Sequence, residues 1–116
     1  MKSDLKTYTK RDITNRVAQE TNTDLRIAGM YVNHVFTAIR KIMMSANPSL
    51  RIEIRGFGVI EVKTTKSKPK ARNPRSGEVI FVPPRRKTHF KPSKLIKKFL
   101  SQPLDGQKVT TEKSLI

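Results

Sequence analysis

In the first half of the chain, apolar residues recur at intervals of three and four positions, which is typical of amphipathic helices. The first helix is predicted over residues 10–20, where Ile13 and Val17 lie one helical turn apart. Just before them, Thr9 and Asp12 have the spacing of a capping box, in which the two residues satisfy amides at the start of a helix. Residues 1–8 are polar without a period and are expected to be an extension.

A second, longer helix is predicted from Leu25 to Ala46, after the polar break TNTD at positions 21–24. Asp24 is its expected N-cap. Apolar residues cover so much of its circumference that one small chain has too little other core to bury them all. The helix is expected to end at Asn47-Pro48, since proline lacks an N–H and restricts the residue before it.

The apolar spacing then changes to two, which predicts strands. In LRIEIR, at positions 50–55, aliphatic residues alternate with charged ones. GFG at 56–58 and VIEV at 59–62 predict a tight reversal into a second strand. VIFVP at 79–83 and KTHF at 87–90 are also strand-like, and Pro92 and Ser93 are expected to start a short third helix that ends at Leu100. The polar segment 101–116 is expected to be a tail.

Between positions 63 and 75 the aliphatic residues almost vanish and lysines and arginines dominate. Because strand-like segments flank it, this stretch is predicted to form the tip of a hairpin arm, over about residues 63–82, that protrudes from the body. Its residues Asn73 to Gly77 carry turn chemistry, since Pro74 fixes φ and Gly77 supplies a positive φ. A solvated basic loop needs neither residue, so an arm that is ordered, or that DNA can order, is favoured.

Charge narrows the possible partners. The chain has 25 Lys and Arg against 9 Asp and Glu, a formal net charge of +16, which indicates a polyanionic partner. No apolar run approaches the roughly 18 residues of a spanning helix, and no apolar segment of a signal peptide is present, so we expect a cytoplasmic protein that binds nucleic acid and not membrane.

Candidate catalytic and metal-binding groups are few. There is no cysteine, the carboxylates are scattered, and the two histidines lie in segments of different type. His34 is expected to be a packing or surface residue, while strand alternation leaves open which face His89 occupies. We therefore expect neither enzymatic activity nor a metal or cofactor.

Taken in order after two helices, GFGVIEV, a basic stretch, ARNPRSGE and FKPSKLIKK resemble the bacterial histone-like HU/IHF family of DNA-bending proteins. The resemblance runs from about Thr9 to Leu100. It implies an α+β fold in which two chains form an intertwined dimer, with a helical base, a β-sheet saddle and two protruding β-hairpin arms. The dimer would contain two identical chains or one chain and a paralogue, bound to double-stranded DNA in the nucleoid.

The resemblance also implies which residues bind DNA. Pro74 falls on the family's intercalating proline, and Arg72 and Asn73 fall on its neighbours at the arm tip. The alternation of the first strand separately suggests Arg55 as a contact on the face away from the aliphatic side chains. The remaining predicted contacts are basic residues of the arm and the body: Lys63, Lys66, Lys68, Lys70, Arg75, Lys10, Arg86, Lys91 and Lys94.

Three departures from the family pattern lie in the strand after GFG and in the arm. The interval from Gly58 to Pro74 is one residue longer than usual, Ile60 replaces an aromatic residue, and lysines largely replace arginines. Lysine lacks the planar fork of arginine, so individual minor-groove contacts follow less directly from the resemblance than the position of Pro74 does.

The function predicted from the sequence is therefore architectural: the protein binds duplex DNA through the minor groove, bends it by proline intercalation, and shapes or compacts the nucleoid. Two alternatives remain open at this point. One is a small basic RNA-binding or ribosomal-type protein, and the other is an interaction module whose arm docks on an acidic protein. General and site-selective DNA binding are not distinguished either, because indirect readout depends on DNA deformability.

Overall fold

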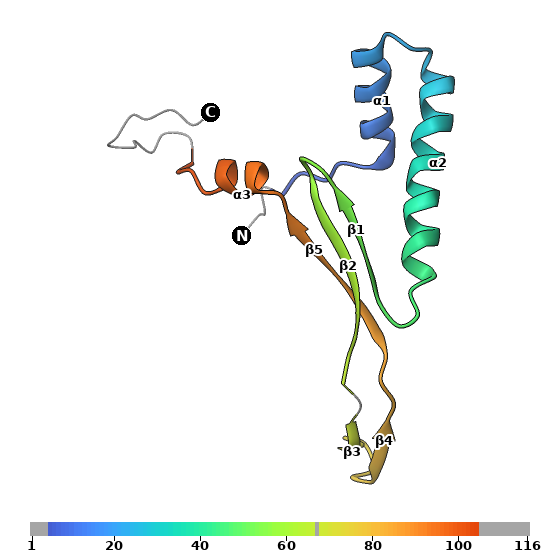
Figure 1. Ribbon diagram of the computed structural model, residues 1–116, viewed down its shortest axis with the longest axis vertical. Helices are drawn as coiled ribbons and strands as arrows, with labels where there is room; N and C mark the ends of the chain where they lie inside the picture. The colour runs from blue at the N-terminus through green and yellow to red at the C-terminus, as the bar shows by residue number, and fades with distance from the viewer. Residues whose placement is uncertain (1–4, 67, 105–116) are drawn as a thin grey trace. The chain divides into compact units, whose positions relative to one another are not determined.

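The computed structural model describes residues 5–66 and 68–104, and the chain divides into a helical unit up to Ser45 and a β-rich unit from Ala46 (Figure 1). Residues 1–4 and 105–116 of the two expected extensions lie outside the described residues. The helices of the first unit have apolar residues at intervals of three and four, whereas the first strands of the second unit have them at intervals of two.

The helical unit is a hairpin of α1 (Lys10–Thr21) and α2 (Leu25–Met44). The Asp12 carboxylate accepts the backbone N–H of Thr9 at 2.7 Å, so the predicted start of α1 is confirmed. Asp24 is the N-cap residue of α2, but its side chain makes no capping hydrogen bond. The helix ends at Met44, two residues earlier than predicted, and its buried residues are Ala28 and Val32.

The β-rich unit contains a three-stranded antiparallel sheet of β1 (Leu50–Ile54), β2 (Gly58–Thr64) and β5 (Arg86–Pro92). The strand order is β1-β2-β5, so β2 is central. In register, Ile60 lies opposite both Ile52 and Phe90, and side chains opposite one another share a face. The register therefore defines an apolar face, formed by Leu50, Ile52, Ile54, Ile60, Val62 and Phe90.

The short helix α3 (Lys94–Leu100) follows β5 and begins where the sequence predicted. Ser93 is its N-cap and accepts the backbone N–H of Ile96 at 3.4 Å. The backbone N–H of Ser93 donates to the carbonyl of Phe57 at 2.9 Å, and the rings of Phe57 and Phe90 lie 5.2 Å apart. These contacts tie the start of α3 to the β1–β2 turn.

The predicted arm segment contains a separate two-stranded ribbon of β3 (Lys68–Arg72) and β4 (Val79–Val82). The sequence pattern did not identify β3, because its residues are mostly basic and show no apolar face. Its pairing depends on backbone hydrogen bonds with β4. Between the sheet and the ribbon, Thr65 donates its N–H to the Arg85 carbonyl at 2.6 Å, and Thr65 Oγ1 accepts the Arg85 N–H at 2.9 Å.

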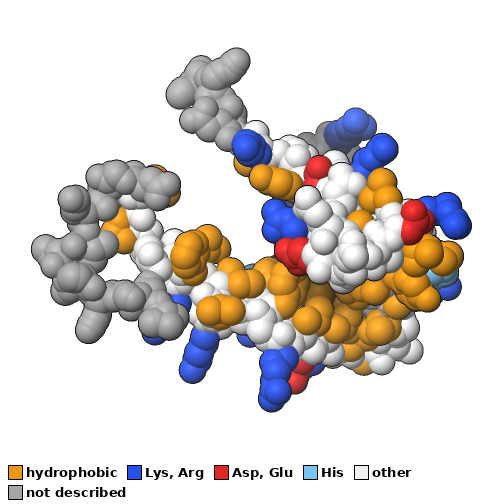
Figure 2. All heavy atoms as spheres, turned by 90° about the horizontal axis from the view of Figure 1, so that it is seen from above, with side chains coloured by type: hydrophobic (Ala, Val, Ile, Leu, Met, Phe, Trp, Pro, Cys, Tyr) orange, Lys and Arg blue, Asp and Glu red, His pale blue; other side chains and the backbone are white. Residues whose placement is uncertain are grey.

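Little apolar surface is buried within the described part of one chain. The buried hydrophobic residues are Ala28, Val32, Ala46 and Val62, and no large side chain among the described residues is fully buried. Figure 2 shows hydrophobic side chains open to the surface over much of the visible face. Exposed residues of α2 include Leu25, Met30, Tyr31, Val35, Phe36 and Ile42. This agrees with the prediction that one chain cannot cover the second helix.

We expect Gly58→Ala to destabilise the sheet strongly. Gly58 has φ +154°, and an added Cβ would lie 2.4 Å from the Lys91 carbonyl oxygen and 2.8 Å from the Phe90 ring. The substitution should lower the free energy of unfolding by roughly 2–4 kcal/mol, in the range of core strain. Gly56→Ala is the matched control, since Gly56 has φ +78° but open space around it, and should cost about 1 kcal/mol. Urea unfolding of both variants tests this; equal losses would contradict it.

Candidate nucleic-acid interface

The tip of the arm is a closed, hydrogen-bonded turn. Asn73 donates its N–H to the Glu78 carbonyl at 2.7 Å, and its own carbonyl accepts the N–H of Gly77 at 2.7 Å. The Asn73 side chain accepts the N–H of Arg75 at 2.8 Å, which is an Asx turn. Gly77 has φ +76°, the conformation for which glycine was expected at this position. The predicted turn chemistry is therefore confirmed, and the tip has a defined shape.

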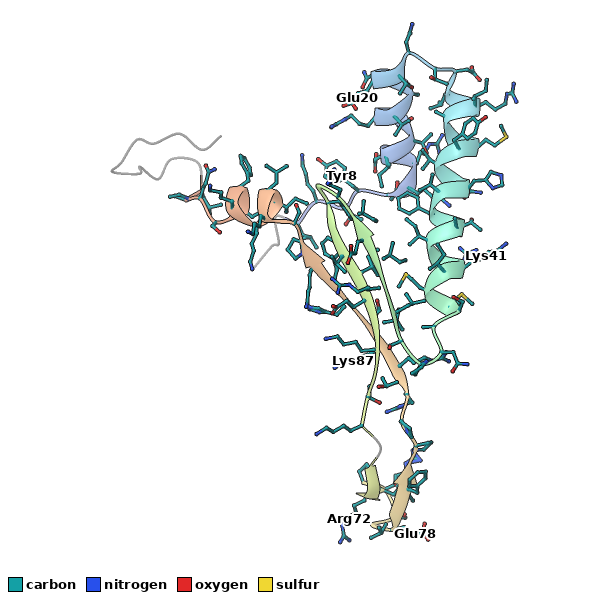
Figure 3. All side chains as sticks on the ribbon, in the orientation of Figure 1. Tyr8, Glu20, Lys41, Arg72, Glu78 and Lys87 are labelled. Carbon is teal, nitrogen blue, oxygen red and sulfur yellow. The ribbon has the colours of Figure 1, made fainter. Side chains whose placement is uncertain are left out.

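Pro74 is exposed in this turn, between Asn73 and Arg75. The Arg72 guanidinium donates one hydrogen bond, to the Gly77 carbonyl at 2.9 Å. This bond holds the Arg72 side chain beside the turn (Figure 3). Arg75 and Lys66 are also exposed. Lys68 and Lys70 lie on β3, but their side chains are outside the described part of the arm.

Strand β4 adds an apolar feature to this basic ribbon. Val79, Ile80 and Phe81 are all exposed, and the Phe81 side chain is 60% exposed. A two-stranded ribbon has no interior, so side chains on both of its faces meet solvent or a ligand. The sequence identified these residues only as a strand, because burial of an apolar run cannot be decided without knowing how many layers cover it.

The polar face of the three-stranded sheet carries a second group of cations. The register places on this face Arg51, Glu53, Val59, Glu61, Lys63, Lys87, His89 and Lys91. Four lysines and arginines therefore share it with two glutamates. Sequence analysis had proposed Lys63 and Lys91 but missed Lys87, which Figure 3 labels. The period-two spacing of Lys87, His89 and Lys91 was the available signal that they share a face. The register, which pairs His89 with Glu61, shows that this face is the polar one.

Glu61 lies at the centre of the polar face and is only 8% exposed. Its Oε1 lies 3.3 Å from Lys63 Nζ, and its Oε2 lies 3.4 Å from Lys91 Nζ. Burial alone would raise the pKa of the Glu61 carboxyl, but the ammonium groups of Lys63 and then Lys91 outweigh burial and hold this pKa below its ordinary value. Glu61 is thus an ionised carboxylate shared by two of the lysines proposed to bind DNA.

Two of the proposed contacts, Arg86 and Arg55, lie outside the polar face of the sheet. Arg86 is opposite Thr64 on the apolar side of the sheet, and its guanidinium donates to the Ala46 carbonyl at 2.7 Å. It therefore holds the segment that follows α2, a structural role that the family resemblance did not indicate. Arg55 follows the last residue of β1 and lies in the turn. Its expected place on a strand face was wrong, because the glycine-rich reversal begins one residue earlier.

The other two body contacts lie at helix starts. Lys10 is the first residue of α1, and its ammonium donates to the Asn33 side chain of α2. Lys94 is the first residue of α3 and is exposed. A cleft near the base of the arm is lined by Asn47, Pro48, Thr64, Pro84, Arg85 and Arg86. Arg85 is a cation that sequence analysis did not single out.

The described residues were also compared with the requirements of a metal site and of a membrane-spanning helix. In residues 5–66 and 68–104, no three His, Asp or Glu side chains come together to hold a metal ion. None of the helices in this part of the chain is long and apolar enough to cross a membrane. The charged groups of the described arm and of the sheet's polar face are mainly cationic.

Residues 8–101 match the family model described as bacterial DNA-binding protein. The chain is 33% identical over 88 residues to DNA-binding protein HU-1 of Halalkalibacterium halodurans, covering 76% of this chain and 93% of that protein. It is 33% identical over 86 residues to DNA-binding protein HTa of Thermoplasma acidophilum, with 74% and 91% covered. The integration host factor subunit alpha of Saccharophagus degradans is 32% identical over 89 residues, with 77% and 84% covered.

Among solved structures, the fold is similar to that of the Anabaena HU–DNA cocrystal structure, with a TM-score of 0.67. The match covers 83% of this chain and all of that one, at 22% sequence identity, so this comparison concerns the fold. It confirms the predicted α+β class and HU-like architecture of the chain. The family is one of non-enzymatic, architectural DNA-binding proteins. With four-fifths of its length matched, the chain belongs to the HU/IHF family of bacterial DNA-binding proteins.

Proposed function

We propose that this chain is an architectural protein that binds duplex DNA through the minor groove with its arm, carries the flanking duplex on the polar face of its sheet, and bends it. The observation that carries this proposal is the closed turn that presents exposed Pro74 at the tip of a basic ribbon. The place of action would be the nucleoid.

The chemistry of the arm tip suits a wedge between base pairs. Proline has a flat apolar ring and no N–H, so it can cover base surface without leaving a donor unpaired. The Asn73–Gly77 hydrogen bonds restrain the ring's position. Arg72 and Arg75 flank it, so cations meet the phosphates on either side of an opened step.

The polar face of the sheet suits the phosphate backbone. Lys63, Lys87 and Lys91 come from two adjacent strands whose register fixes the spacing of these side chains. Contacts of this kind position a duplex but carry no sequence information. They would extend the bound site beyond the arm and stabilise a bent path, since a bent duplex contacts more of the protein.

We further propose that the functional unit is a dimer, of two identical chains or with a paralogue. The exposed apolar side chains of α2 and α3, such as Tyr31, Phe36, Leu95 and Phe99, are too many and too large for a stable solvated surface. A partner chain of the same fold would cover them. Two arms would then be available for one duplex.

The alternatives from sequence analysis predict other behaviour. A-form RNA has a wide, shallow minor groove, which gives a narrow ribbon with a proline tip little to enter. An arm that docks on an acidic protein would leave DNA curvature unchanged. Affinity for RNA and the end-to-end distance of bound DNA therefore separate these alternatives from the proposed function.

DNA affinity should depend steeply on salt. If six lysines and arginines of the arm and sheet each neutralise one phosphate, the slope of log K against log salt should be about −5. Fluorescence titrations of a duplex between 50 and 200 mM salt measure it. A slope near −1 would mean that these cations are not the binding surface, and preference for duplex RNA at equal salt would favour the RNA-binding alternative.

Folding should require association. Because apolar faces of the helices lack cover within one chain, the thermal midpoint should rise with protein concentration. Sedimentation at micromolar concentration should give the mass of two chains. A folded species with the mass of one chain would rule out the dimer.

Pro74→Ala should reduce DNA bending while affinity falls by less than about tenfold, or 1.4 kcal/mol. Alanine covers too little base surface to offset unstacking, which costs a few kcal/mol per step, but the charges and the turn's Asn73 and Gly77 bonds remain. Energy transfer across a doubly labelled duplex, at saturating protein, measures the bend.

The matched control removes charge and keeps the wedge. Lys70→Gln with Arg72→Gln should weaken binding and reduce the salt slope by about 2. Complexes that still form should remain bent. If Pro74→Ala leaves the end-to-end distance unchanged, the proline is a turn residue only, and the intercalation part of the proposal fails.

A further inference from the structure

The polar face of the sheet, although strongly cationic, has a carboxylate at its centre. Glu61 is the one buried charged residue in the described part of the chain. It lies on the central strand β2, directly opposite Arg51 of β1 and His89 of β5. A carboxylate in this position faces the phosphates of any duplex laid across the sheet, and the proposed function alone does not explain it.

The two lysines that contact Glu61 are placed so that each can bind either this carboxylate or an anion from solution. Lys63 and Lys91 lie 3.3 and 3.4 Å from its two oxygens, yet their side chains are 59% and 54% exposed. Each ammonium group therefore has one side against the carboxylate and another side open to a ligand. Three donors on each ammonium allow it to turn from one anion to the other without moving the strand.

We propose that Glu61 is an internal counterion that competes with DNA phosphates for Lys63 and Lys91, and so limits both the affinity and the salt dependence of DNA binding. The inference rests on the proposed use of the polar face by DNA. With Glu61 ionised, the three side chains carry a net charge of +1, whereas the two lysines alone would carry +2. The group therefore neutralises about one phosphate instead of two.

The pair of Arg51 and Glu53 on the same face is a natural comparison. Its atoms lie 3.2 Å apart, but both side chains are more than half exposed. Solvent and salt screen such a pair, and a phosphate can reach Arg51 with little change at Glu53. Glu61 is covered by its lysines and has no such screening, so its charge acts mainly on them.

The test is Glu61→Gln, which keeps the size of the side chain and removes the charge. The variant should bind duplex DNA more tightly than the wild type, and its log–log salt slope should be steeper by about 0.9. The ratio of variant to wild-type affinity should consequently be about 3.5 times larger at 50 mM salt than at 200 mM. The salt concentration differs fourfold between these conditions, and four raised to the power 0.9 is about 3.5.

Two controls separate this role from a general effect of net charge. Glu53→Gln makes the same charge change on the same face and should steepen the slope less. In a Lys63→Gln, Lys91→Gln background, Glu61→Gln should lose its effect on the slope, because Glu61 acts through those lysines. Equal effects of the two glutamate variants, or a full effect without the lysines, would overturn the inference.

Thermal unfolding shows whether each variant is folded. If Glu61→Gln does not fold, Glu61→Met, which is neutral and needs no hydrogen bonds, takes its place with the same expected outcome. The wild-type slope distinguishes the two proposals. A wild-type slope near −1 contradicts the proposed function itself, whereas a steep wild-type slope that neutralising Glu61 leaves unchanged or makes shallower contradicts only this inference.

Discussion

The register of β2 between β1 and β5 is the constraint on which the candidate interface depends. Side chains along a strand alternate between faces, so a slip of one residue would exchange the apolar and polar sets. The observed register pairs Ile60 with Phe90 on one face and Glu61 with His89 on the other. It thereby assembles Lys63, Lys87 and Lys91 into one surface, although these residues are up to 28 positions apart in the sequence.

Backbone hydrogen bonds, and not side-chain burial, shape the arm. The ribbon has two strands and no covering layer, and its turn is closed by bonds from Asn73 and Gly77. The described cations at its tip, Arg72 and Arg75, are exposed, so solvent screens their like charges. The turn also leaves Pro74 uncovered, which a wedge requires. The exposure of Pro74 and of the arginines beside it is thus consistent with the function we propose for the arm.

Opposite charges within the sheet moderate the large positive charge of the chain. Glu61 holds two lysines whose mutual repulsion would otherwise oppose folding, and the same carboxylate faces the duplex in the bound state that we propose. Stability of the free protein and affinity for DNA then place conflicting demands on one residue. The exposed apolar residues of the helices raise a similar conflict, because they are unfavourable in a single chain in water. In the dimer that we propose, the partner chain would cover them.

The sequence by itself determined the helices, the strands of the sheet and the turn at the arm tip, because apolar period, capping residues and Asn-Pro and Gly chemistry are local. It also carried the family motifs. Only the tertiary structure decided the pairing of β3, the face of His89, the role of Arg86 at the Ala46 carbonyl, and the sharing of Glu61 by two lysines. Each of these depends on residues brought together from distant positions, and no local pattern specifies which residues those are.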